Sequence, residues 1–404
     1  MEAIKNFIKK ETVLSAAVLL ALLSMLFVPP DPAYLGYIDY RTIGLLFCLM
    51  TVMAGFQKLG VFRAIGQWLL GKLRKPVQVA AVLVFLCFFF SMVITNDVAL
   101  ITFVPFGIAV LKMAGLERLV LSVVVLQTIA ANLGSMLTPI GNPQNLYLYS
   151  RAGMSAGEFL LLMLPYTAAS FLMLALCILM LKMRGADFAG SADSEGRAGS
   201  AGSEEARTAS GFSKEDGEEG VSPISSSGRG RRAFYMEGIG YGLLFLLALA
   251  AVAKLFPWQA LVVLTAVLVF FVDRRLFLRV DVSLLLTFAA FFIFIGNMGR
   301  MESFAAFLSR ILEGHEVLTA VGASQVISNV PAALLLSGFT DQWEALIVGT
   351  NLGGLGTLIA SMASLISYKQ IAGRYPQEKG RYLLWFTVGN VVFLAVLLLL
   401  FWFR

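Results

Sequence analysis

The feature of this sequence that most restricts its fold is a succession of apolar runs, most of them close to the ~20 residues that a helix needs to cross a bilayer. The runs cover residues 12–28, 41–57, 117–149, 157–183, 234–254, 257–272, 282–299, 341–367 and 382–403. Of the 404 residues, 58% are hydrophobic and 14% are charged, which is far from the composition of a soluble globular protein. The sequence therefore predicts an all-α polytopic membrane protein with nine crossings.

Two further apolar segments, 76–113 and 317–340, are each interrupted by a short polar tip. The tips contain Thr95, Asn96 and Asp97 in the first segment and Ser328 and Asn329 in the second. A polar tip at membrane depth is tolerated only where it faces protein or a water-filled cavity, so we predict two re-entrant hairpins. The first segment is also long enough for two full crossings. Amphipathic pieces at 61–75 and 300–316 precede the two segments and are interpreted as interfacial helices.

The chain repeats itself around these tips. Residues 91–100 and 324–333 share Ser, Val, Ile, Asn and Ala at positions 233 residues apart, and residues 131–140 and 350–359 share Asn, Leu, Gly, Thr and Ile at a spacing of 219. Gly and Pro in the second pair predict that the helices at 117–149 and 341–367 are broken in mid-membrane. The breaks contribute eight candidate site residues: Asn132, Gly134, Thr138, Gly141, Asn142, Asn351, Gly353 and Thr357.

The repeats divide the chain into two halves. Residues 1–183 form the first repeat, 184–233 are rich in Gly, Ser, Ala, Glu and Arg and predict a disordered cytoplasmic linker, and 234–404 hold one extra span and the second repeat. The extra span inverts the second repeat, which predicts the inverted-repeat architecture of secondary transporters. A cytoplasmic N-terminus and an outer C-terminus leave only six of the 31 basic residues outside, as the positive-inside rule requires.

Several function classes are excluded by what the sequence lacks. The chain has one His and no His-Glu-x-x-His zinc helix or Gly-x-x-x-x-Gly-Lys-Ser/Thr phosphate loop, so neither an enzyme nor an ATP-driven motor is expected. The basic residues lie beside apolar spans, so nucleic acid is not an expected partner. The partners expected are the lipid bilayer and a small molecule or ion.

The tips and breaks also carry a resemblance. Thr95-Asn96-Asp97, Asn132-Leu-Gly-Ser, Thr138-Pro-Ile-Gly-Asn-Pro-Gln-Asn145 and Ser328-Asn329-Val-Pro resemble the ion transporter superfamily, which includes arsenite permeases, NhaD-type sodium/proton antiporters, citrate carriers and divalent anion/sodium symporters. The most similar branch is the YbiR-like inner-membrane branch of the citrate-carrier family. The resemblance implies a homodimer in a bacterial inner membrane, with a scaffold domain and an elevator-type transport domain. It also implies sodium near Asn96, Asp97 and Asn329, although the third tip position differs between the halves, where Asp97 matches Val330.

Asp97 is the one ionisable residue that the sequence places deep inside a predicted span, and a carboxylate there is a candidate functional group. With no basic residue at that depth, a site containing Asp97 favours a cation, a proton, a neutral oxyacid or an anion that enters with a cation. We therefore expect a proton- or sodium-coupled carrier of a small anion or oxyacid, such as citrate or arsenite, with no cofactor beyond the coupling ion. A sodium/proton antiporter without organic cargo and an ion channel are the alternatives.

Overall fold

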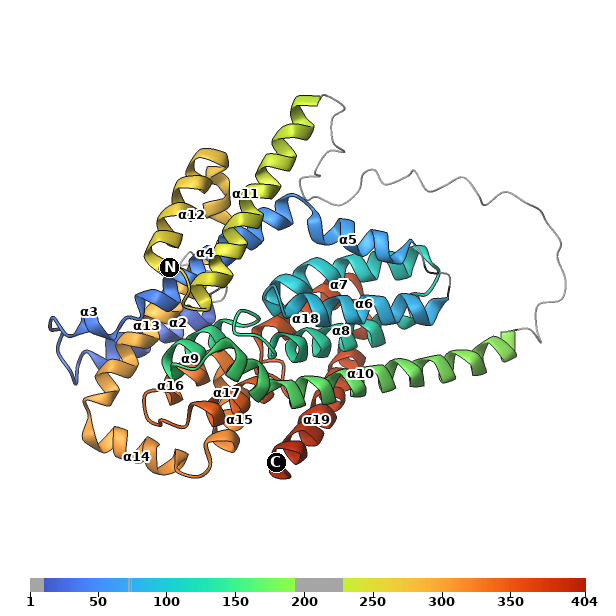
Figure 1. Cartoon of the computed structure of the whole chain (residues 1–404). Coiled ribbons are helices and arrows are strands. Elements are labelled where there is room, and N and C mark those ends of the chain that lie inside the picture. The colour runs from blue at the N-terminus through green and yellow to red at the C-terminus, as the bar shows by residue number, and fades with distance from the viewer. Residues whose placement is uncertain (1–10, 72, 74, 193–227) are drawn as a thin grey trace.

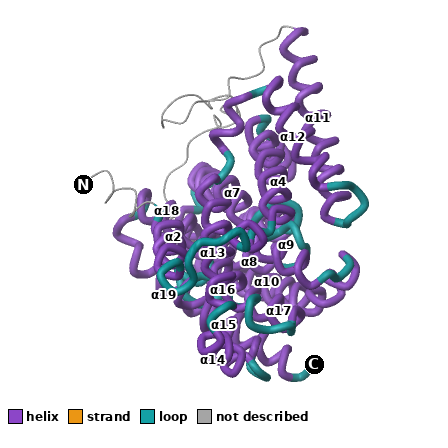
Figure 2. The backbone as a smooth tube through the Cα atoms, turned by 90° about the vertical axis from the view of Figure 1, so that its left-hand side faces the viewer, coloured by secondary structure: helices purple, strands orange, loops and turns teal. Residues whose placement is uncertain are grey.

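The computed structural model describes residues 11–71, 73, 75–192 and 228–404, and every regular element within these ranges is a helix (Figures 1 and 2). The all-α prediction is confirmed for this part of the chain. The basic head at 1–10 and residues 193–227 of the predicted linker lie outside it. Helix α10 runs to Ala192 and α11 begins at Gly228, so both helices extend into the range 184–233, and the linker stays a prediction.

Among the described residues, six helical stretches are long and apolar enough to cross a membrane: Tyr40–Lys58 (α4), Asn96–Met113 (α7), Glu117–Ser135 (η1 and α8), Ala156–Leu181 (within α10), Val282–Gly299 (α13) and Pro376–Trp402 (η3 and α19). Five shorter apolar stretches accompany them: Thr12–Ser24 (α2), Pro76–Ser91 (α6), Met236–Val252 (within α11), Trp258–Val272 (α12) and Glu316–Ile327 (α15). Nine crossings were expected: five of these runs contain long helices, those at 12–28, 234–254 and 257–272 contain shorter ones, and the run at 341–367 is broken. α7, one arm of the first polar-tipped segment, is long enough to cross alone.

Both polar-tipped segments form pairs of helices. α6 (Pro76–Ser91) contacts α7 (Asn96–Met113), and α15 (Glu316–Ile327) contacts α16 (Asn329–Leu336). The turn at Ser328 has a φ of 73°, a left-handed conformation that is uncommon outside glycine and that reverses the chain at one residue. Each tip thus presents the start of a helix to the rest of the fold.

The two helices with internal breaks lie next to these pairs. In the first half, α8 (Val120–Ser135) is followed by α9 (Pro143–Ala152), with Pro143 at the start of α9, where its missing N–H costs nothing. In the second half, α17 (Trp343–Leu352) is followed by α18 (Met362–Arg374). The remaining elements are α3 (Tyr34–Tyr37), the amphipathic helices α5 (Val61–Leu70) and α14 (Glu302–Leu312), and the short η2 (Arg274–Arg279).

The helices form two main groups. In the first group α4 contacts α11, α12 and α13, and α13 contacts α2, with α11 and α12 projecting at the top of Figure 1. α6, α7, α8 and α18 form the second group, against which α10 and α19 lie. The pieces α9, α15, α16 and α17 are joined to both groups, since α9 contacts α4 and α17 contacts α8. The polar breaks therefore lie between the groups.

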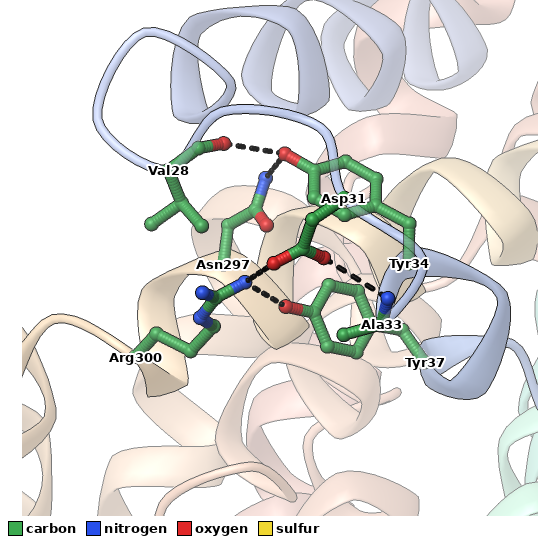
Figure 3. A network of polar contacts seen from close by, with 7 residues as sticks. All are labelled: Val28, Asp31, Ala33, Tyr34, Tyr37, Asn297 and Arg300. Carbon is green, nitrogen blue, oxygen red and sulfur yellow. Dashed lines mark hydrogen bonds and ion pairs between the residues drawn. The ribbon is translucent and has the colours of Figure 1, made fainter.

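Polar contacts fasten the first group. Lys58 at the end of α4 lies 3.0 Å from Glu237 of α11 and 3.0 Å from Asp273 after α12. At the opposite end of α4, the loop after α2 is held to α13 by the contacts shown in Figure 3, in which Arg300 lies 2.7 Å from Asp31 and Asn297 donates to Tyr34. The hydrogen bond from Arg300 lowers the pKa of the Asp31 carboxyl.

Candidate functional site

Each hairpin tip is bonded to the break beside it. The backbone N–H of Asn96 donates to the carbonyl of Gly141 at 3.2 Å, and the N–H of Asn329 donates to the carbonyl of Ala360 at 3.0 Å. Asn96 and Asn329 are matched at the spacing of 233 residues, and Gly141 and Ala360 at the spacing of 219. The same hydrogen bond therefore occurs in both halves of the chain.

Further matched contacts join tip and break. The hydroxyl of Thr138 donates to the Met92 carbonyl at 2.5 Å, and that of Thr357 donates to the Gln325 carbonyl at 3.2 Å. These threonines are candidate site residues, and here they hold the break against its hairpin.

The candidate glycines of the breaks lie against protein. A Cβ on Gly134 would lie 2.0 Å from the Phe88 carbonyl oxygen, one on Gly141 would lie 2.1 Å from the Ser135 oxygen, and one on Gly353 would lie 2.5 Å from the Ser324 hydroxyl. No side chain fits at these distances without movement of a neighbour. These glycines let the broken helices approach the hairpins and the chain fold back on itself.

Asn132 is the centre of a buried polar network. Its side-chain oxygen accepts hydrogen bonds from the amide of Asn96 at 3.0 Å and from the hydroxyl of Ser361 at 3.1 Å, while its own amide donates to Ser364 at 3.3 Å. All four side chains are buried. Because Asn96 and Asn132 belong to the first half and both serines to the second, the network joins the two halves.

Asn351, the match of Asn132, makes the reciprocal contact. Its amide donates to the side-chain oxygen of Asn145 at 2.7 Å, and Asn145 matches Ser364 at the spacing of 219. The first piece of each broken helix thus bonds to the second piece of the other one, α8 to α18 and α17 to α9. This exchange is what two equivalent halves produce when they meet face to face.

Several polar atoms beside the network have no hydrogen-bond partner. They are the side-chain oxygens of Asn142 and Asn351 and both the oxygen and the nitrogen of the Gln144 amide. Gln144 is 1% exposed. The Asn142 amide donates to Ser135 at 2.7 Å, which leaves its oxygen free to accept. Buried polar atoms normally have partners, so this cluster has spare capacity to bind a ligand, an ion or ordered water.

The side chain of Asp97 does not belong to the Asn132 network. Its backbone N–H bonds to the Asn96 side chain, but its carboxylate lines a cavity of ≈ 170 Å³ between α4 and the first hairpin. Thr95 and Asn142 share this cavity, and so do Arg279 and Asp281, which precede α13. Arg279 lies outside every predicted span, and the end of η2 brings it to the cavity that Asp97 lines.

The structure brings some candidate residues together and keeps others apart. Asn96 and Asn132 are in direct contact, whereas Asn329 and Ser328 reach the network only through the break at residue 360. Asp97 lies on the cavity side of its tip, so within the described part of the chain no hydrogen bond joins Asn329 to Asn96 or Asp97. The candidate set omits Asn145 and Arg279, and the sequence marks Gln144, Ser361 and Ser364 only as secondary candidates. Two of these, Asn145 and Ser364, are detectable in the sequence, since they occupy matched positions after the two breaks.

An all-helical chain with several apolar spans and buried polar contacts at its helix breaks defines a multi-pass membrane protein. The chain belongs to the citrate transporter family, whose model (CitMHS) matches residues 6–341. It is 29% identical over 381 residues to the inner membrane protein YbiR of Escherichia coli K12, with 92% of each chain covered. It is 28% identical over 393 residues to the uncharacterized transporter MJ0456 of Methanocaldococcus jannaschii, covering 96% of this chain and 94% of the relative. The silicon efflux transporter LSI3 of rice is 31% identical over 170 residues, 41% of this chain and 34% of that protein.

Proposed function

We propose that this protein is a secondary active transporter, coupled to protons or sodium, that moves a small anion or oxyacid across a bacterial inner membrane by alternating access. Its two halves would be inverted repeats, with the N-terminus cytoplasmic and the C-terminus outside. The hairpin-bearing group of helices would move against the group around α4, as an elevator does, within a homodimer. The family is named for citrate transport and one relative for silicon efflux, which supports a small oxygen-rich cargo.

The observation that carries the proposal is the reciprocal bonding between the halves. Asn132 bonds to Ser364 and Asn351 bonds to Asn145 at matched positions, so each half contributes equivalent groups to one buried centre. Inverted repeats that meet through broken helices place substrate and ion sites at their interface. The unpartnered oxygens of Asn142 and Asn351 lie at this centre and supply ligands for cargo or ion.

Asp97 supplies the coupling group in this proposal. No described residue donates a side-chain hydrogen bond to its carboxylate, and the cavity that it lines is continuous with Thr95 and Asn142 at the break. A carboxylate in such a position takes up a proton or a cation. Arg279 and Asp281 line the same cavity and their charges offset each other. With a charged Asp97 the lining is negative by one charge, which favours entry of a cation, or of an anion that enters with a cation beside it.

A sodium/proton antiporter without organic cargo is the second candidate. It is favoured by the asymmetry of the two tips, because Asp97 has only Val330 at the matched position and one carboxylate suffices to exchange one proton for one sodium ion. The two candidates differ in whether proton movement requires an anion or oxyacid.

The test is a flux assay with purified protein in proteoliposomes that hold a pH-sensitive dye, with sodium, citrate, succinate or arsenite added outside in turn. A proton signal that appears only with one anion or oxyacid supports the coupled carrier and identifies its cargo, and a signal with sodium alone supports the antiporter. Asp97→Asn should abolish the signal, whereas Asp341→Asn, the same change on an exposed loop, should not. Single-channel current steps in place of saturable flux would contradict both candidates.

A further inference from the structure

A large apolar groove lies between three helices, and none of the residues at the polar breaks lines it. It has a volume of ≈ 710 Å³ and lies between α8, α10 and α19, which contact one another and are labelled together in Figure 1. The absence of a side chain at Gly389 of α19 enlarges the groove, since a Cβ there would lie 3.1 Å from the end of the Ile129 side chain. Its rim is strongly exposed, with Met180 52% and Val388 54% exposed. In a membrane, a groove of this kind is accessible to lipid chains.

One end of the groove is polar and basic. Arg118 lies one helical turn before Ser122, which lines the groove, and Arg381 lies one turn before Trp385, which also lines it. The Arg381 guanidinium is 5.4 Å from the centre of the Trp385 ring and 3.8 Å from the Glu378 carboxylate. The opposite end, around Phe393, is apolar.

The charges at the basic end favour an anion. Lys379 begins α19 and joins Arg118 and Arg381, while the acidic residues at the same helix ends are Glu117 and Glu378. The three basic and two acidic residues give this end a net charge of one positive, and both arginines are exposed. Basic pockets between membrane helices bind anionic lipid head groups, and a guanidinium matches phosphate geometry with two parallel hydrogen bonds. A tryptophan beside them suits the level of the head groups.

We infer that this groove is a binding site for one anionic phospholipid, with an acyl chain between α8 and α19 and the phosphate at Arg118 and Arg381. The inference does not depend on the proposed transport activity. A zwitterionic lipid of the same chain length fills the apolar part equally well but lacks the net negative charge that the basic end attracts. The site therefore selects by head group and not by chain.

Native mass spectrometry of the full-length protein in detergent, with phosphatidylglycerol and phosphatidylcholine of equal chain length, tests the inference. We expect preferential retention of one phosphatidylglycerol. Replacing Arg118 and Arg381 together by Gln should weaken that binding by about fivefold for each arginine removed and leave phosphatidylcholine unchanged.

Val388→Trp should fill the groove and displace both lipids, whereas Thr387→Trp, on an exposed neighbouring position outside the groove, should displace neither. The arginine variants leave every residue that lines the groove unchanged, so they test the inference even if Val388→Trp does not fold. Equal retention of the two lipids by the unaltered protein would overturn the inference. So would efficient disulfide cross-linking of Val388→Cys between two copies in native membranes, which would assign the groove to a second copy of the chain.

Discussion

Gly134→Ala is the change whose effect the structure defines most closely. The added Cβ would lie 2.0 Å from the carbonyl oxygen of Phe88 and 2.6 Å from the hydroxyl of Ser91. The carbonyl is backbone and cannot rotate away, so α6 and α8 must separate by about 1 Å to reach a distance of about 3 Å. Forcing an extra methyl group into a packed interior costs about 1–3 kcal/mol, which exceeds the gain of up to about 1 kcal/mol from replacing a helical glycine by alanine. Gly134→Ala should therefore lower stability.

Gly322→Ala is the control, because Gly322 also lies within a helix, α15, but has nothing within 4 Å of its Cβ position. The assay is thermal unfolding in detergent together with the labelling rate of Cys87, a fully buried thiol on α6, in a variant that lacks the other two cysteines. Separation of α6 from α8 should speed labelling in Gly134→Ala and leave it unchanged in Gly322→Ala. Equal stability and equal labelling of the two variants would refute the reasoning.

Three further predictions concern the polar contacts. Asn132→Ala removes three side-chain hydrogen bonds, each worth about 0.6 kcal/mol between membrane helices. Unfolding assays should therefore show that the free energy of unfolding falls by about 2 kcal/mol. A fall no larger than that of an exposed Asn→Ala change would contradict the network. Lys58→Met leaves Glu237 and Asp273 unpaired at a partly exposed site, and we expect a loss of about 1 kcal/mol that Lys58→Arg largely avoids in the same unfolding measurement. Because Arg300 lowers the pKa of Asp31, that contact stabilises the fold above the ordinary Asp pKa and the stabilisation disappears as the pH falls through the lowered value; the Asp31→Asn variant should lack this part of the pH dependence of its melting temperature.

The helical class and the location of the polar centre are predictable from the sequence, because a bilayer tolerates polar groups only where protein or water satisfies them. The sequence match between Asn132 and Asn351 also identifies two residues that each form a hydrogen bond to the other half of the chain. The length of each span is less predictable. The run at 12–28, for example, stays apolar up to Val28, but α2 ends at Ser24, ahead of Pro29 and Pro30.

The direction in which Asp97 points is not predictable from its neighbours. Asn96 and Asp97 lie in the first turn of α7, where successive side chains diverge by about 100°. Asn96 therefore faces Asn132 while Asp97 faces α4, and treating the tip as one cluster misses this. The role of Arg279 is not predictable for another reason. It lies outside every apolar run, and only the folded loop before α13 brings it to the cavity.

The two tips share their backbone bonding but not their charge, and this has an evolutionary and practical consequence. Whatever the origin of the repeat, the contacts that hold tip to break have stayed alike in both copies, while ionisable chemistry is confined to the copy with Asp97. Val330 occupies the position in the second tip that matches Asp97 in the first. Exchanging the two residues, Asp97→Val with Val330→Asp, would move the carboxylate to the other tip, while the shared hydrogen bonds are made by the backbone of Asn96 and Asn329 and not by the exchanged side chains.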